Sequence, residues 1–232
     1  MARLRDYLEL CRVSNLPTVW TNVLAAAVLA GASTSWGTLF PLAALSLLYC
    51  AGMALNDCCD APEDARLRPE RPVPSGRVTR AAAGTFAALL AAAALVLLGL
   101  SPHPSAAAAG LLLALVIAAY DLLHSRTPLS VLLMAACRFG CYGVTAVAVS
   151  GQLPAAAAAG GMVQFLYVLL LTVVARREKR RGEGRSRVPA MLCGIPLVDG
   201  AVSLAAGTPY VLPAALAASA ATAAGQRLFR GD

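Results

Sequence analysis

The chain has 232 residues, of which 59% are hydrophobic and 13% charged, and its formal net charge is +7. Soluble domains average roughly 45–50% apolar and about 25% charged residues, so this composition excludes an ordinary soluble protein. A membrane-spanning helix uses about 20 apolar residues, and about eight of them would leave no room for a large extramembrane domain. We therefore expect one transmembrane domain that covers residues 1–232.

Apolar stretches separated by proline, glycine or charged residues predict the helices in chain order. They fall at about residues 13–33, 38–56, 78–100, 105–123, 127–150, 154–175, 188–206 and 209–228. The stretches are continuous rather than alternating, which is typical of helices, and a helix satisfies its own backbone in lipid. The sequence therefore predicts an all-α, polytopic integral membrane bundle of about eight transmembrane helices.

Arginine and lysine gather in alternate connections between these predicted helices. They precede the first helix, follow the second, fourth and sixth, and close the chain, whereas the other connections carry none. By the positive-inside rule, both termini and the basic connections face the cytoplasm. We expect an integral protein of the cell membrane whose basic residues orient the helices and contact membrane lipids. The positive charge therefore requires no nucleic acid as a partner.

One short acidic segment follows the second predicted helix. Asp57, Asp60 and Asp64 are spaced i, i+3 and i+7, so a helix would place them on one face, and Asn56 comes directly before. Carboxylates this close repel one another unless a cation lies between them. Hard oxygen ligands suit Mg²⁺, which bridges carboxylates to phosphates. The pattern predicts that the three aspartates bind Mg²⁺, and Pro62 predicts that the segment straddles a helix end and a turn.

Arginines follow this acidic segment within a few residues. Arg68 and Arg71 stand just beyond Asp64, so cationic side chains and a metal site would lie together. A diphosphate needs both, because Arg forks bind phosphate oxygens alongside a metal ion. We expect this end of the bundle to bind a diphosphate.

The acidic segment and the loop after it carry a family resemblance. The pattern is Asn56-Asp57-x-x-Asp60-x-x-x-Asp64, followed by Arg71-Pro72-x-Pro74-Ser75-Gly76. It resembles the first aspartate-rich motif and adjoining loop of the UbiA superfamily of intramembrane prenyltransferases. The resemblance extends to the first span, from Asn15 to Asn22, and to Tyr120 and Thr127 at the end of the fourth.

The resemblance implies an all-helical enzyme, usually of nine spans. Such an enzyme takes a polyprenyl diphosphate from the bilayer and transfers the prenyl group, with Mg²⁺, to an aromatic or other lipophilic acceptor. Catalytic roles fall on Asp57, Asp60 and Asp64. The resemblance and the charge pattern together give these candidate substrate-binding residues: Asn22, Asn56, Arg68, Arg71, Tyr120, Arg126, Arg138, Arg176 and Glu178.

The chain departs from the family pattern where a second aspartate motif should follow the sixth span. Residues 175–183 contain no aspartate. Glu178 could hold a metal there and Arg176 could contact phosphate directly; alternatively, the loop is a basic stop signal and that metal site is lost. Near Tyr120, His124 stands where the family often has a lysine, with Arg126 one place from the usual arginine. One span fewer than usual is predicted.

Two charged residues fall inside predicted spans. Arg138 and Asp199 each lie ten residues inward from the proline that precedes or opens the helix, so they should lie at similar depth. A charge within the membrane needs a partner. We predict that the two pair with each other or face one polar cavity with Asn22 and Gln164. A pair would lock two helices together, whereas a polar cavity would bind the acceptor.

Two other function classes share parts of this pattern. CDP-alcohol phosphotransferases also place aspartates at a membrane mouth, but their motif has a glycine where this chain has Ala61, and it continues into later aspartates that are absent here. The stronger alternative is a non-catalytic UbiA-like membrane factor that binds or handles a prenyl lipid. The atypical second motif favours that alternative.

Overall fold

The computed structural model describes residues 3–32, 36–181 and 186–228. Within these ranges the chain forms α-helices joined by turns and two short 3-10 helices, with no strand, which confirms the all-α prediction. The elements are α1 (Leu4–Leu10), η1 (Val13–Asn15), α2 (Leu16–Leu29), η2 (Trp36–Thr38), α3 (Leu39–Leu67), α4 (Arg80–Gly99), α5 (Ala106–Leu123), α6 (Ser130–Ser150), α7 (Ala155–Arg181), α8 (Val188–Ala205) and α9 (Val211–Leu228).

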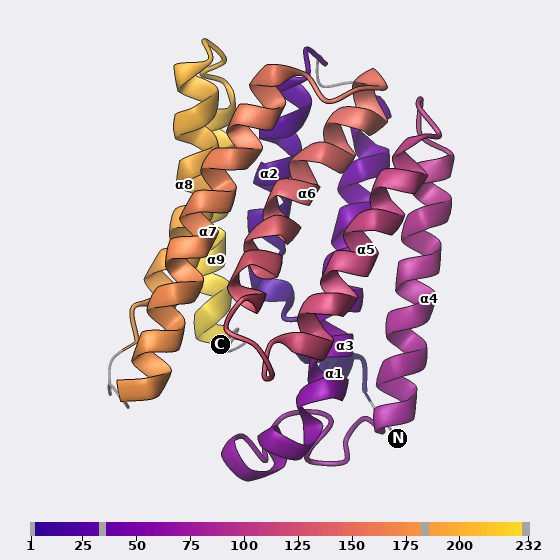
Figure 1. Cartoon of the computed structure of the whole chain (residues 1–232), viewed down its shortest axis with the longest axis vertical. Coiled ribbons are helices and arrows are strands. Elements are labelled where there is room, and N and C mark those ends of the chain that lie inside the picture. Colours follow the sequence, from indigo (N-terminus) through magenta and orange to yellow (C-terminus); the bar gives the residue numbers. More distant parts are fainter. Residues whose placement is uncertain (1–2, 33–35, 182–185, 229–232) are drawn as a thin grey trace.

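The long helices pack side by side as a bundle (Figure 1). Among the described residues, six helices, α3 to α8, are long and apolar enough to cross a membrane. The predicted first and eighth spans are α2 and α9; α2, even with η1, is a shorter apolar helix of residues Val13–Leu29. The protein is therefore an integral membrane protein, and the prediction of about eight spans is correct as an approximation.

Helix α2 occupies the centre of this bundle. It contacts α3, α6, α7, α8 and α9, whereas α4 packs mainly on α3 and α5. Val19 and Val23 of α2 join the core with Leu45 and Leu48 of α3, and all four side chains are buried. A short helix suffices here because its neighbours, rather than lipid, cover it. The outer helices instead turn leucines such as Leu112 outward.

Helix α3 differs from its prediction. The second span was expected to end near residue 56, with a turn at Pro62, yet α3 runs without interruption to Leu67. Pro62 removes one backbone hydrogen bond, and the helix continues past it. This extension carries the aspartates beyond the apolar part of the helix. It keeps Asp57 and Asp64, two turns apart, on one face.

Candidate functional site

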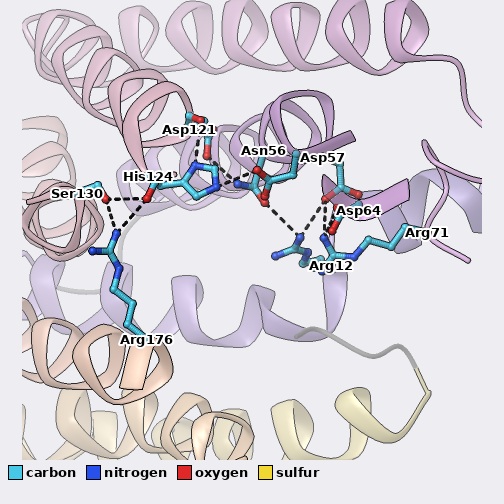
Figure 2. Close-up of polar contacts among 10 residues, drawn as sticks. Arg12, Asn56, Asp57, Asp64, Arg71, Asp121, His124, Ser130 and Arg176 are labelled. Carbon is cyan, nitrogen blue, oxygen red and sulfur yellow. Dashed lines mark hydrogen bonds and ion pairs between the residues drawn. The ribbon is translucent and has the colours of Figure 1, made fainter. Parts of the chain in front are cut away.

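Two of the predicted aspartates meet a predicted arginine at the end of the bundle where α1 lies (Figure 2). Asp57 and Asp64 are only 3% and 4% exposed. Nη1 of Arg71 lies 2.7 Å from Oδ2 of Asp64 and 3.7 Å from Oδ1 of Asp57. The tight loop after α3, in which Ser75 Oγ donates to the Arg71 carbonyl, positions this arginine. The two carboxylates thus share one cationic partner, as buried charges require.

A second arginine reaches the same carboxylate from the N-terminal segment. Nη2 of Arg12 lies 3.0 Å from Oδ1 of Asp57 and donates to Oδ1 of Asn56 at 3.3 Å. Arg12 has a φ of 46°, in the left-handed region that residues with a side chain rarely adopt. Arg12 is one of the basic residues before the first predicted span, for which only a role in orienting the helices was expected. Its closeness to Asp57 depends on packing between segments far apart in the chain, which no sequence pattern indicated.

The third aspartate faces another partner. Oδ1 of Asp60 lies 2.9 Å from Nε2 of His124, at the end of α5. The hydrogen bond that His124 donates to Asp60 raises the pKa of His124 above its usual value, although partial burial opposes this. His124 was not among the predicted site residues; the signal for it was its place where the family often has a lysine.

The carboxylates offer a partial fit to Mg²⁺. Oδ1 of Asp57 and Oδ2 of Asp64 both face the guanidinium group of Arg71, so these hard oxygen atoms lie close to one place. In the described part of the chain, no three acidic, histidine or cysteine side chains lie close enough to hold a metal together. Mg²⁺ commonly takes one or two carboxylates and completes its shell with water and substrate phosphates. The pair formed by Asp57 and Asp64 therefore fits, whereas Asp60 points to His124.

An apolar cavity lies next to this polar cluster. It is lined by residues of α2, α3, α5 and α6: Val19, Leu45, Leu48, Tyr49, Gly52, Met53, Leu113, Ile117, Tyr120, Asp121, Met134, Cys137, Arg138 and Cys141. Nδ2 of Asn56 donates to Oδ1 of Asp121 at 3.3 Å and so connects the two regions (Figure 2). The predicted residues Tyr120 and Arg138 both line this cavity. A long apolar chain could therefore lie beside the aspartate cluster.

Residues predicted from the second motif have other partners. Arg176 donates to the carbonyls of His124, Thr127 and Pro128 and to Oγ of Ser130, and thereby ties α7 to the α5–α6 loop. Glu178 accepts hydrogen bonds from Ser186 Oγ and the Arg187 backbone N–H at the start of α8. Both side chains hold helix ends in place, so the contacts that they make are structural.

Two predicted arginines lie outside the cluster. Arg68 and Arg126 are exposed, and their side chains make no hydrogen bond or ion pair with any residue that the structure describes. Neither meets the aspartates. Their roles in binding substrate stay predictions.

The two charged residues inside the bundle share one polar network. Asn22 lies between them: its Oδ1 accepts from Arg138 Nη1 at 2.8 Å, and its Nδ2 donates to both Asp199 oxygens at 2.9 and 2.8 Å. Tyr142 Oη and Gln164 Nε2 also donate to Asp199 Oδ1, at 2.5 and 2.7 Å. Asp199 is fully buried. The predicted association with Asn22 and Gln164 is thus present, but an amide, rather than direct contact, joins Arg138 to Asp199.

Comparison with known proteins places the chain in a family. A sequence model of the UbiA prenyltransferase family matches residues 16–231. The chain belongs to the UbiA family. This UbiA chain is 38% identical to digeranylgeranylglyceryl phosphate synthase of Methanopyrus kandleri over 84 residues, which cover 36% of this chain and 31% of that relative. It is 33% identical to protoheme IX farnesyltransferase of Parvibaculum lavamentivorans over 146 residues, 57% and 43% of the two chains.

The matches thus span less than half the length of these relatives. Solved structures extend the UbiA likeness over nearly the whole chain. A UbiA homolog from Archaeoglobus fulgidus bound to GPP and Mg²⁺ has a TM-score of 0.64 at 13% identity, covering 94% of this chain and 86% of that one. A structure of digeranylgeranylglyceryl phosphate synthase has a TM-score of 0.63 at 17% identity, with coverage of 97% and 93%. At these identities the comparison establishes the UbiA fold.

Proposed function

We propose that this UbiA protein is a prenyltransferase that moves a prenyl group from a polyprenyl diphosphate to a lipophilic acceptor, assisted by Mg²⁺. One observation carries the proposal: a buried pair of carboxylates shares Arg71, and one of the pair also contacts Arg12, beside an apolar cavity between the helices. The two halves of a prenyl diphosphate, a charged head and an apolar chain, match these two regions. Homologues named as prenyltransferases support the same activity.

The charged half of the site acts on the leaving group. Breaking the bond between the prenyl carbon and the diphosphate builds negative charge on the diphosphate, and positive groups fixed at that place stabilise the transition state. Arg71 and Arg12 lie 3.7 and 3.0 Å from Asp57 Oδ1, so both would face a diphosphate bound there. Mg²⁺, held by Asp57 and Asp64, would add positive charge at the same oxygens. Asp60 belongs to the proposed site through its contact with His124.

The apolar half protects the reactive carbon. An allylic cation reacts rapidly with water, so the cavity must exclude water while the acceptor approaches. The cavity wall is built mainly from apolar side chains of α2, α3, α5 and α6, and its polar members include Tyr49, Tyr120, Asp121 and Arg138. We infer that both termini and the aspartate cluster face the cytoplasm in the cell membrane, as the distribution of basic residues indicates.

The proposal is tested with membranes that contain the full chain. Radiolabelled geranyl, farnesyl and geranylgeranyl diphosphates are supplied with long-chain alcohol and phenol acceptors, in Mg²⁺ or in EDTA. We expect diphosphate release and a prenylated product that require Mg²⁺ and fall at least about a hundredfold in Asp57→Asn, because one fixed electrostatic partner contributes that much. Glu70→Gln, the same chemical change at an exposed acid after α3, should keep the wild-type rate.

The outcomes separate the proposal from the alternative predicted from the sequence. If wild-type protein binds prenyl diphosphate but forms no product with any acceptor tested, the protein is a non-catalytic UbiA-like factor that handles a prenyl lipid. Turnover that is equal in Asp57→Asn and wild type would also contradict the site. A rate that depends on Mg²⁺ and Asp57 supports the prenyltransferase.

A further inference from the structure

Asp121 is a buried carboxylate that the aspartate motif does not contain. It lies near the end of α5, is 3% exposed and lines the apolar cavity. Asn56 Nδ2 donates to its Oδ1 at 3.3 Å, but Oδ2 has no hydrogen-bond partner among the residues that the structure describes. A buried polar atom without a partner costs about 1–3 kcal/mol. Such an atom in a substrate cavity is expected to find its partner on the substrate.

The surroundings of Asp121 separate it from the diphosphate-binding groups. Arg71 and Arg12 contact Asp57, and His124 Nε2 contacts Asp60, whereas the ring Nδ1 of His124 meets only the backbone carbonyl of Asp121. No ion pair in the described part of the chain neutralises the Asp121 carboxylate. Figure 2 shows Asp121 on the far side of Asn56 from Asp64 and Arg71. Asp121 therefore lies beside the proposed diphosphate site and is connected to it through Asn56.

We propose that Asp121 is the catalytic base of this protein and that the acceptor is a lipid hydroxyl, which donates its hydrogen bond to the unpartnered Oδ2. The inference deepens the proposed prenyl transfer and rests on it. A carboxylate within hydrogen-bond reach of the proton that it removes is the geometric requirement for a general base. An apolar cavity with one free carboxylate oxygen selects an acceptor that is apolar apart from a single proton donor.

The bond changes balance without a further reactant. The bond between C1 of the prenyl group and the diphosphate oxygen breaks, and its electron pair leaves with the diphosphate. C1 forms a bond to the hydroxyl oxygen of the acceptor. The hydroxyl proton passes to Oδ2 of Asp121, and the product is a prenyl ether. Protonated Asp121 releases its proton to solvent after the ether leaves.

The experiment compares two acceptors in Asp121→Asn. The amide keeps a carbonyl oxygen for Asn56 and nearly the same volume, but it cannot take a proton. The probes are hexadecan-1-ol, an aliphatic alcohol, and 4-hexadecylphenol, a much stronger acid, each with geranylgeranyl diphosphate and Mg²⁺. We expect ether formation from the alcohol to fall about 10²–10⁴-fold, the usual contribution of a general base. The phenol should lose at least tenfold less, because its proton leaves more easily.

Binding and folding are measured on the same variants. The Kd for geranylgeranyl diphosphate and the unfolding temperature should stay at the wild-type values in Asp121→Asn, while Asp121→Glu should recover part of the alcohol reaction. Equal losses with both acceptors, an unchanged rate, or weakened diphosphate binding would each overturn the role of Asp121 as a base. Wild-type protein that forms no product from either acceptor would overturn the proposed function itself. If only the role of Asp121 is wrong, wild-type protein still forms product and the reaction still depends on Asp57.

Discussion

The buried network around Asp199 gives the sharpest test of how this bundle is held together. Asp199→Ala removes a fully buried carboxylate that accepts four hydrogen bonds, two from Asn22 and one each from Tyr142 and Gln164. The neighbouring donors stay in place. Gln164 keeps a second acceptor, the carbonyl of Ile195, but Tyr142 has no other acceptor recorded among the described residues. The network joins α2, α6, α7 and α8, so its loss should weaken the whole bundle.

The magnitude follows from the number of bonds. Side-chain hydrogen bonds inside membrane proteins average about 0.6 kcal/mol each, so four of them contribute about 2.4 kcal/mol. Removing one member of a buried charged set costs about 3–5 kcal/mol in soluble proteins, because the partner is left uncompensated. Here Arg138 keeps its bonds to Asn22 and to Thr18, which reduces that penalty. We expect Asp199→Ala to lower the free energy of unfolding by about 2–4 kcal/mol.

The assay is reversible unfolding by SDS in mixed micelles, followed by circular dichroism. Ser203→Ala is the matched control, since Ser203 lies one turn further along α8, is fully buried and has an Oγ without a hydrogen-bond partner among the described residues. Its free energy of unfolding should change by less than about 1 kcal/mol. Equal stabilities of the two variants would refute the structural role. An Asp199→Ala protein that is stable but does not react with acceptors would instead indicate an acceptor-binding cavity.

Other predictions concern helix contacts and pH. Arg176→Ala should cost about 1–2 kcal/mol of stability by freeing the α5–α6 loop, whereas the exposed Arg177→Ala should not; equal unfolding curves would contradict this. Gly160→Ala should cost about 1–3 kcal/mol, because its Cβ would lie 2.7 Å from Leu29 and 2.9 Å from Tyr142, while Gly84→Ala, in open space, should cost nothing; a reversed order in thermal unfolding would exclude tight packing at Gly160. Since Asp60 raises the pKa of His124 above 6.5, the pair should stabilise the fold fully below pH 6.5 and lose that contribution as the pH rises through the raised pKa. Stability measured against pH should lose this slope in His124→Gln, and an unchanged slope would show that another group is responsible.

Pro62 shows where a local rule failed. A proline inside a helix removes one hydrogen bond, and from the sequence this predicted a helix end within the acidic segment. In the folded protein α3 continues to Leu67. Its far end is supported by contacts with other segments: Arg71 on Asp57 and Asp64, Arg12 on Asp57, and His124 on Asp60. These tertiary contacts outweigh the loss of one backbone bond.

The second aspartate motif shows the opposite case. Arg176 and Glu178 were candidates for phosphate and metal because they occupy the expected place after the sixth span. Their side chains instead satisfy backbone groups of the α5–α6 loop and the start of α8. Their place in the sequence is suitable for a second metal site, but the direction of each side chain depends on how the end of α7 packs against its neighbours. The alternative left open at the start, a connection without a second metal site, agrees better with these contacts.

The sequence by itself determined the class of protein and the chemistry of its charged end. Composition and continuous apolar runs require helices in a membrane, because lipid cannot satisfy an open backbone, and the spacing of Asp57 and Asp64 places both on one helix face. Only the tertiary structure decided which residues complete the site. Arg12 comes from the N-terminal segment, whereas Asp121 and His124 come from the end of α5, and the meeting of both segments with α3 depends on helix packing. Local patterns carry no information about such packing, because the directions of buried side chains are set by neighbours far apart in the chain.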